Sequence, residues 1–233
     1  MTEKKRFLTM ENVEIFEDKR ATNYNEFVEA WIPNYHYFLS KLPQILSQTT
    51  NKKLLVAGCG TGNEIAYFIE NSKQWEILGV DPSPEMIAQA RKKLQEYKNV
   101  TLIEGLVSDL SSSQKFGAAT LLLVLHFMED DGTKLNLLKS IAERLENNAP
   151  LVLLDITGTK KQLKENLQIL RQLLPKTITE EEINNRLYRI ENKLKSVSEE
   201  RLRELLIKAG FEAPLRFFQT SIYMGWITTK RTN

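Results

Sequence analysis

One short segment limits what this chain can fold into more than any other. An apolar run at residues 53–57 ends in the turn GCGTG at residues 58–62, and Asp81 follows 23 residues after Gly58. Glycines let the backbone turn sharply and approach a ligand closely, and a helix that follows presents free N–H groups at its first turn. An acid about 20 residues further on can reach the hydroxyls of a ribose. The segment therefore predicts a strand, a turn and a helix that bind a nucleoside cofactor.

The chain from residue 53 onward alternates between strand-like and helix-like patterns. Short apolar runs separated by amphipathic stretches are typical of β-α units with right-handed crossovers. We therefore predict an α/β fold with a doubly wound, mostly parallel sheet, and an antiparallel end where the last two strands are joined by a tight turn. The expected strands are residues 53–57, 75–80, 100–104, 119–124, 151–155, 211–219 and 222–229, and the expected helices are residues 62–70, 83–97, 133–146 and 198–209.

Two segments fall outside this alternation. Residues 21–48 have apolar side chains at helical spacing, punctuated by prolines, which predicts two short helices. Residues 160–196 carry two apolar helical faces and predict a helical hairpin inserted after the fifth strand. Because those faces need partners, we predict a homodimer through the insert. The expected organisation is an N-terminal helical lid at residues 1–50, a cofactor-binding domain at residues 51–157 and 198–233, and a helical insert at residues 158–197.

Composition narrows the environment in which the protein works. The 233 residues carry a net charge of +2, which gives no general attraction to nucleic acid or to an anionic membrane. The longest apolar stretches are of strand length, and the first residues lack the apolar run of a signal peptide. Cys59 is the single cysteine, so no internal disulfide can form. We expect a cytoplasmic protein that does not contact membranes.

The sequence does not predict a metal site. No cysteine or histidine spacing is typical of zinc. The acids at residues 129–131 precede a predicted helix, where negative charge stabilises the helix dipole. That explanation needs no metal ion.

Two classes of nucleoside cofactor fit the glycine turn. The pyrophosphate fingerprint of dinucleotide-binding folds requires a small residue at position 63, which is Asn63 here. The third glycine is instead Gly62, so the spacing is G-x-G-x-G. The turn suits the carboxylate end of a bound amino acid as well as a phosphate. An NAD-dependent oxidoreductase is therefore disfavoured.

Four segments of the sequence together resemble one family. LLVAGCGTG (54–62), ILGVDPSPEMIAQAR (77–91), TLIEGLVSDL (101–110) and FGAATLLLVLHFM (116–128) are similar to the cofactor-binding motifs of class I S-adenosylmethionine-dependent methyltransferases. The resemblance implies a Rossmann-like, seven-stranded sheet whose final strand is antiparallel. It also implies S-adenosyl-L-methionine as the cofactor and an enzyme that transfers a methyl group.

The resemblance implies a role for each matching residue. The glycine turn passes under the methionine part and the ribose, Asp81 holds the ribose hydroxyls, and the remaining residues flank the adenine or line the place where cofactor and substrate meet. One position departs from the family, because Val56 stands where an acid is usual. The cofactor's ammonium then relies more on backbone carbonyls, such as those of Gly58 and Leu123. The implied cofactor-binding residues are Gly58, Cys59, Gly60, Gly62, Asp81, Pro82, Ser83, Met86, Leu106, Val107, Leu123 and Leu125.

A narrower resemblance involves both ends of the chain. Residues 16–21 (FEDKRA), 32–35 (IPNY) and 208–211 (KAGF) are similar to the carboxy-S-adenosylmethionine synthases of bacterial tRNA wobble-uridine modification, a dimeric family. That family uses an arginine on the helix before the Ala-Gly-Phe turn. Leu205 takes this position here, and Arg203 lies on a different helical face. An extra carboxylate would lack its bidentate partner, so an ordinary methyltransferase is favoured.

Few side chains offer acid–base chemistry. Methyl transfer from a sulfonium needs alignment and exclusion of water, and needs a base only if the nucleophile must lose a proton. His126 directly follows the fourth predicted strand, at the edge where such sheets bind ligands, so it is the candidate base; core or loop-orienting roles are the alternative. Arg20, Tyr24 and Tyr35 on the lid are candidates for binding the methionine carboxylate or an acidic substrate, and the tyrosines also fit plain core packing.

Three functions therefore stay open. The favoured one is a methyltransferase that acts on a small molecule. The alternatives are a carboxy-S-adenosylmethionine synthase-like enzyme and a non-catalytic S-adenosylmethionine-binding partner subunit. A nucleic-acid substrate is disfavoured because no dense basic and aromatic stripe is present, although a tRNA-related role stays open. The sequence does not identify the methyl acceptor.

Overall fold

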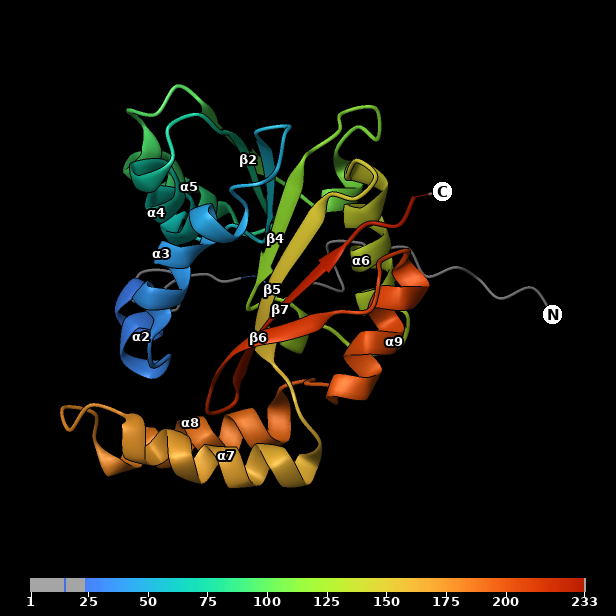
Figure 1. Cartoon of the computed structure of the whole chain (residues 1–233). Coiled ribbons are helices and arrows are strands. Elements are labelled where there is room, and N and C mark those ends of the chain that lie inside the picture. Colours follow the sequence, from blue (N-terminus) through green and yellow to red (C-terminus); the bar gives the residue numbers. More distant parts are fainter. Residues whose placement is uncertain (1–14, 16–23, 233) are drawn as a thin grey trace.

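The chain folds around one seven-stranded sheet (Figure 1). The computed structural model describes Ile15 and residues 24–232. The strand order is β3-β2-β1-β4-β5-β7-β6; β1 to β5 are parallel to one another, and β7 is antiparallel to both β5 and β6. The predicted α/β class and the antiparallel end of the sheet are confirmed. The strands are β1 (Lys53–Ala57), β2 (Glu76–Asp81), β3 (Val100–Glu104), β4 (Ala118–Leu122), β5 (Pro150–Ile156), β6 (Leu215–Thr220) and β7 (Tyr223–Thr229).

The strand order creates the place where a ligand can bind. The chain winds outward from β1 to β2 and β3, then returns to place β4 on the other side of β1. The loops that follow β1 and β4 therefore diverge and leave a crevice at the carboxyl ends of these strands. The glycine turn follows β1, and the segment from Leu123 to Met128 follows β4. The first and the fourth of the four sequence motifs thus meet at this crevice.

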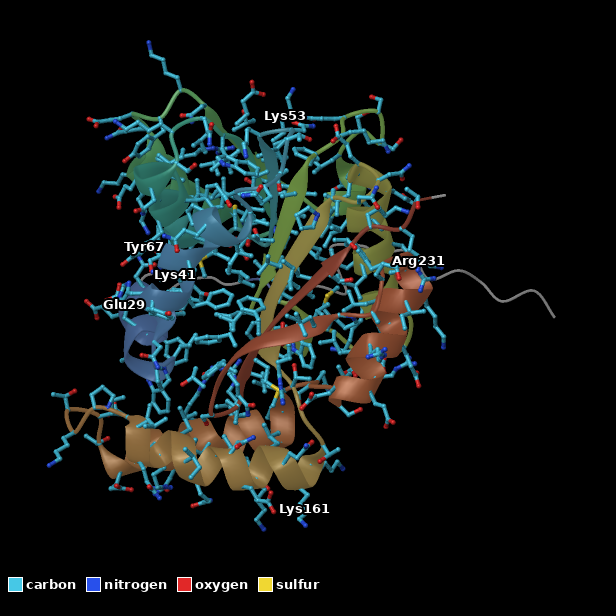
Figure 2. The ribbon with its side chains drawn as sticks, viewed as in Figure 1. Glu29, Lys41, Lys53, Tyr67, Lys161 and Arg231 are labelled. Carbon is cyan, nitrogen blue, oxygen red and sulfur yellow. The ribbon has the colours of Figure 1, made fainter. Side chains whose placement is uncertain are left out.

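Helices cover both faces of the sheet (Figure 1). One face packs against α3, α4 and α5, and the other packs against α6 and α9. Side chains alternate between these layers along β1: Leu54 and Val56 face the first, and Leu55 and Ala57 the second. The charged side chains labelled in Figure 2 point outward from the layers. The helices are α4 (Asn63–Asn71), α5 (Pro84–Leu94), α6 (Thr133–Arg144) and α9 (Glu199–Ala209), with short 3-10 turns at Val107–Asp109 and Leu125–Phe127.

Two strand ends differ from the prediction for local reasons. The fourth strand ends at Leu122 rather than at residue 124, because Leu123 takes a left-handed conformation with φ +62°. This kink turns the chain toward the crevice. The sixth strand begins at Leu215 rather than at residue 211. Pro214 precedes it and has no N–H to donate to a neighbouring strand.

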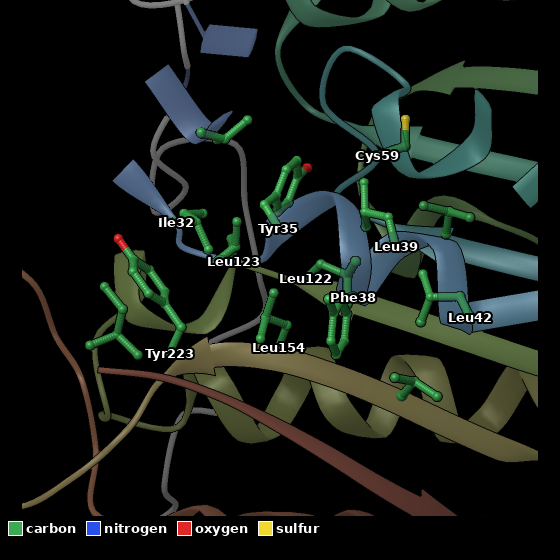
Figure 3. Packing of buried hydrophobic residues seen from close by; sticks show 14 of the residues in the cluster. Ile32, Tyr35, Phe38, Leu39, Leu42, Cys59, Leu122, Leu123, Leu154 and Tyr223 are labelled. Atoms are coloured by element: carbon green, nitrogen blue, oxygen red, sulfur yellow. The ribbon is translucent and has the colours of Figure 1, made fainter. Parts of the chain in front are cut away.

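The N-terminal lid contains the two predicted helices. They are α2 (Tyr24–Trp31) and α3 (Tyr35–Ile45), separated by Pro33. Phe38 anchors α3, since its ring is 1% exposed and lies 5.0 Å from Phe218 and 6.0 Å from Phe217, measured between centroids. Figure 3 shows Phe38 beside Leu122 and Leu154, so the lid is continuous with the core of the sheet.

The insert contains the predicted helical hairpin, α7 (Lys160–Leu173) and α8 (Glu180–Lys193). Each helix starts with a capping box, Thr159 with Gln162 and Thr179 with Glu182. The apolar faces are not left without partners: Leu163, Leu167, Leu170, Ile183, Leu187 and Ile190 are buried in the chain's own core cluster. The argument from unpartnered faces to a dimer was therefore wrong. The homodimer itself stays a prediction without that support.

Phe38→Ala is expected to loosen the lid. Truncating a buried phenylalanine leaves a cavity, and the free energy of unfolding should fall by about 3–5 kcal/mol, as measured by urea denaturation. Its neighbour Tyr37 is 59% exposed, so Tyr37→Ala is the matched control and should change it by less than about 0.5 kcal/mol. Equal losses in the two variants would contradict this packing of α3.

Candidate cofactor-binding site

The glycine turn is shaped by two backbone hydrogen bonds and by left-handed conformations. The N–H groups of Gly58 and Cys59 both donate to the carbonyl of Val80, at 2.8 and 3.1 Å. Gly58 has φ +73° and Gly60 has φ +50°, which side chains disfavour. A Cβ on Gly58 would lie 2.5 Å from Val124 Cγ2, whereas one on Gly60 would meet only Tyr24 Cε1, at 3.9 Å. Gly58 thus permits close packing against the β4 loop, and Gly60 leaves open a space that faces Tyr24.

The acid at the end of β2 ties this turn to the next loop. Gly60 N–H donates to Oδ2 of Asp81 at 2.9 Å, and Ser83 N–H donates to Oδ1 at 2.9 Å. Burial raises the pKa of Asp81, and the hydrogen bonds from Ser83 and Gly60 oppose that rise. Each carboxylate oxygen can accept more than one hydrogen bond. Asp81 can therefore hold both loops and still accept hydrogen bonds from a ligand diol.

These loops surround a pocket at the carboxyl ends of the strands. Asp81 supplies a charged side chain beside Gly60, and Tyr24 covers Gly60 from the lid. Apolar side chains from the loops after β2, β3 and β4 form the remaining wall. The predicted site residues that line it are Tyr24, Gly58, Gly60, Asp81, Pro82, Ser83, Met86, Leu106, Val107 and Leu123. Their contact with a cofactor stays a prediction.

About half of the residues that line the pocket were not predicted from the sequence. The missed residues follow or precede predicted ones at strand ends, and Phe127, Met128 and Leu137 come from the segment after β4 and from α6. The positive φ of Leu123 directs this segment into the crevice, and a strand predicted to reach residue 124 hides that turn. The other missed residues are Ala57, Val80, Gly105, Leu121, Leu122 and Val124.

Four of the described residues predicted to bind the cofactor do not line the pocket. A Cβ on Gly62 would lie 2.8 Å from Leu94 Cδ1, so this glycine serves the packing of α4 on α5. The Cys59 side chain points at Gly79 of β2, and burial raises the pKa of its thiol. Leu125 packs in the opposite core layer, and Tyr35 lies behind the wall within the lid cluster (Figure 3). Arg20 lies outside the described residues.

The structure places His126 away from the pocket wall. Its ring is 3% exposed, and Nδ1 lies 2.8 Å from Oδ1 of Asp155. Asp155 also accepts hydrogen bonds from the N–H groups of Leu125 and Ile156, at 2.8 Å each. The carbonyl of His126 accepts from Lys195 N–H at 2.8 Å. This geometry fits the orienting alternative, in which His126 holds the β4 loop against the end of the insert.

A buried lysine stabilises the same loop. Lys134 is fully buried, and its Nζ donates to the carbonyls of Leu125, Met128 and Lys195. Burial lowers the pKa of Lys134, and the charge of Asp155 opposes the change. No pattern in the sequence separates this lysine from the exposed Lys139 on the same helix. The network fixes the segment that carries Phe127 and Met128 into the pocket.

One acid near the glycine turn was also missed. Glu64, in the first turn of α4, is 5% exposed, and its Oε1 has no hydrogen-bond partner among the described residues. Burial raises the pKa of Glu64 from 4.5 to about 7, and Thr120 offsets part of the rise. Two lid phenols lie near it: burial raises the pKa of Tyr24 and of Tyr35, and the charge on Glu64 adds to both shifts. A carboxyl so placed is costly to ionise without a cation.

The described residues contain neither a group of side chains that could hold a metal ion nor a helix that could span a membrane. Between residues 24 and 232, no three His, Cys, Asp or Glu side chains group so as to hold a metal ion. Within that same range, no helix has both the length and the apolar character for spanning a bilayer.

Known proteins with similar sequences share the domain around the pocket. Residues 55–151 match a family model described as a methyltransferase domain. A carboxy-S-adenosyl-L-methionine synthase of Helicobacter pylori is 30% identical over 149 residues, which cover 59% of this chain and 59% of that protein. The synthase of Actinobacillus pleuropneumoniae is 24% identical over 224 residues and 92% of both chains. The match to the first of these relatives thus spans about three fifths of its length.

Solved structures show the same fold at low sequence identity. A human N-acetylserotonin methyltransferase solved with its cofactor is 17% identical with a TM-score of 0.64, over 91% of this chain and 56% of that one. A plantazolicin methyltransferase is 14% identical with a TM-score of 0.70, over 93% of this chain and 92% of that one. Residues 55–151 thus match a methyltransferase domain, and the chain has the fold of these methyltransferase structures.

Removing the charge of Glu64 is expected to flatten the pH dependence of stability. Because the folded pKa of about 7 exceeds the ordinary value of 4.5, the folded state holds its proton where the unfolded state has lost it. The wild type should therefore lose up to about 3 kcal/mol relative to Glu64→Gln as pH rises from 4.5 through 7. Urea denaturation at pH 5 and pH 8 measures the difference.

Glu70, exposed on the same helix, supplies the control for this measurement. The free energy of unfolding of Glu70→Gln should change between pH 5 and pH 8 as that of the wild type does. A Glu64→Gln variant that also tracks the wild type across this range would show that the carboxyl is not buried as described.

Proposed function

We propose that this chain is an S-adenosylmethionine-dependent methyltransferase that acts on a small molecule. The observation that carries the proposal is the Asp81 carboxylate, held by Gly60 and Ser83 at the mouth of an otherwise apolar pocket. A ribose diol fits this carboxylate, and the space that Gly60 leaves open suits a ligand that passes close to the backbone. The methyltransferase domain match covers these residues.

The residues present fit the cofactor part by part. Met86, Leu106 and Val107 offer apolar surface for an adenine, next to the ribose position at Asp81. When bound, the cofactor supplies a methyl group on a sulfonium, whose leaving group is already activated. The chain then has to align the acceptor and exclude water. Leu123, Val124 and Phe127 form the dry wall that this requires.

Tyr24 is better suited to donate a hydrogen bond than to act as a base. Burial raises the pKa of its phenol, and the charges of Asp81 and Glu64 raise it further. The phenol therefore keeps its proton at neutral pH. Positioned over Gly60 at the edge of the pocket, it can orient an acceptor or the cofactor. Because Tyr24 does not act as a base, the reaction suits an acceptor that is already nucleophilic and need not lose a proton.

The second candidate is a carboxy-S-adenosylmethionine synthase-like activity, favoured by the names of the curated relatives. An extra carboxylate on the cofactor needs a guanidinium partner. Leu205 on α9 is 1% exposed within the core, and Arg203 is exposed to solvent. No arginine lines the pocket in the described part of the chain. These observations support the plain cofactor, while a non-catalytic binding subunit and a tRNA-related role stay alternatives.

Asp81→Ala is expected to weaken binding of S-adenosylhomocysteine, the reaction product, by about 100-fold in calorimetry. Both ribose hydrogen bonds to a charged acceptor are lost, and each contributes roughly 1.5 kcal/mol. Glu104 is exposed and pairs in register with Asp81 on β3, so Glu104→Ala is the control and should bind like the wild type. Unchanged affinity in Asp81→Ala would overturn the assignment of the pocket.

The mass of the copurified ligand separates the two enzymatic candidates. Native mass spectrometry of the purified protein should detect plain S-adenosylmethionine or S-adenosylhomocysteine. A cofactor heavier by one carboxyl group would instead support the synthase-like activity and would contradict our preference.

A further inference from the structure

Glu64 is a buried acid, and the described contacts of the fold leave one of its oxygens without a hydrogen bond. It is the second residue of α4, directly after the glycine turn, and is 5% exposed. In the described structure its Oε1 accepts no hydrogen bond, whereas Thr120 on β4, whose hydroxyl can donate, lies close enough to lower the pKa of the carboxyl. A buried carboxylate oxygen without a donor is costly and rare in native proteins. A ligand that brings an N–H donor to this spot would satisfy it.

The surroundings of Glu64 are rich in acids and phenols; the cation Arg186 on α8 acts on Tyr24, but no described cation contributes to the pKa of Glu64 itself. Tyr24 faces it from α2, Tyr35 from α3 and Cys59 from the glycine turn, and each has its pKa raised partly by Glu64. Thr120 faces it from β4. Asp81, at the end of β2, acts on Tyr24 and Cys59 and so adds a second negative charge to the region. A cationic group would be stabilised here, and an anionic one would be repelled.

The position of Glu64 relative to the pocket identifies which part of the cofactor it can meet. Asp81 marks the ribose, so the adenine lies toward Met86 and the other end of the cofactor lies toward Gly58, Leu123 and Tyr24. Tyr24 covers Gly60 at this end and is electrostatically coupled to Glu64. The amino-acid end of the cofactor therefore approaches the side of the pocket on which Glu64 and Tyr24 lie.

We propose that Glu64 accepts a hydrogen bond from the ammonium group of the cofactor's methionine part and provides its counter-charge. The proposal rests on the proposed function, because it requires an S-adenosyl amino acid in the pocket. The ammonium is the group that fits, since the sulfonium has no N–H to donate and the carboxylate would be repelled. Val56 on β1 offers no charge, so in this chain the acid comes from Glu64 on helix α4 instead.

Binding should release a proton. The carboxyl is about half protonated near pH 7 before the ligand arrives, because burial raises its pKa to about 7. An ammonium beside it favours the carboxylate and lowers that pKa again. The affinity for the cofactor and its product then rises with pH through the neutral range.

Calorimetry with two probes tests the proposal without any turnover. The probes are S-adenosylhomocysteine and the analogue in which hydrogen replaces the amino group. Removal of the amino group should weaken binding to the wild type by roughly 10-fold but should leave binding to Glu64→Gln almost unchanged. In two buffers of different ionisation enthalpy at pH 7, S-adenosylhomocysteine should release about half a proton from the wild type, and much less from Glu64→Gln.

Each outcome decides one of the two claims. If the amino group contributes equally in the wild type and in Glu64→Gln, Glu64 is not its partner and the inference is wrong, while the proposed function stands. If neither probe binds the wild type, the proposed function fails. Glu70→Gln, on the exposed side of the same helix, should match the wild type with both probes. Near-ultraviolet circular dichroism of Glu64→Gln shows that a loss of coupling does not reflect unfolding.

Discussion

The site depends on one buried carboxylate that joins two loops. Asp81 accepts a hydrogen bond from Gly60 with one oxygen and from Ser83 with the other, each at 2.9 Å. The strand order brings the ends of β1 and β2 side by side, and Val80 receives two further N–H groups of the glycine turn. The turn is thus held open before any ligand arrives. Such preorganisation lowers the cost of ordering a binding loop.

Two buried acids at the pocket disfavour a cofactor that brings further negative charge. Asp81 lines the pocket, Glu64 is coupled to the lining residue Tyr24, and both acids are buried. A pyrophosphate would bring two negative charges into this region, whereas an S-adenosyl amino acid brings a sulfonium and an ammonium. The charge distribution therefore agrees with the G-x-G-x-G spacing, in which Asn63 replaces the small residue of the dinucleotide fingerprint. Asn63, which departs from the dinucleotide fingerprint, and the buried acid Glu64 are adjacent in the first turn of α4.

The sequence predicts elements well where local chemistry decides and poorly where tertiary contacts decide. The strand, glycine turn and acid could be read from spacing alone, and ten predicted residues line one pocket. His126 was a reasonable candidate by its place after β4, but only the fold brings Asp155 within 2.8 Å of its Nδ1. Glu64 looked like an ordinary acid in a first helical turn; its burial depends on the lid packing over it. The apolar faces of α7 and α8 were correctly found, yet their partners in the same chain were not, because the partners are far apart in sequence.

A crystal structure of the protein with S-adenosylhomocysteine tests the central claim most directly. The account predicts that both ribose hydroxyls lie within hydrogen-bond distance of Asp81, and that the amino group lies beside Glu64 at the end of the pocket covered by Tyr24. Electron density that places the ribose away from Asp81, or the ligand outside the pocket between the β1 and β4 loops, would contradict it.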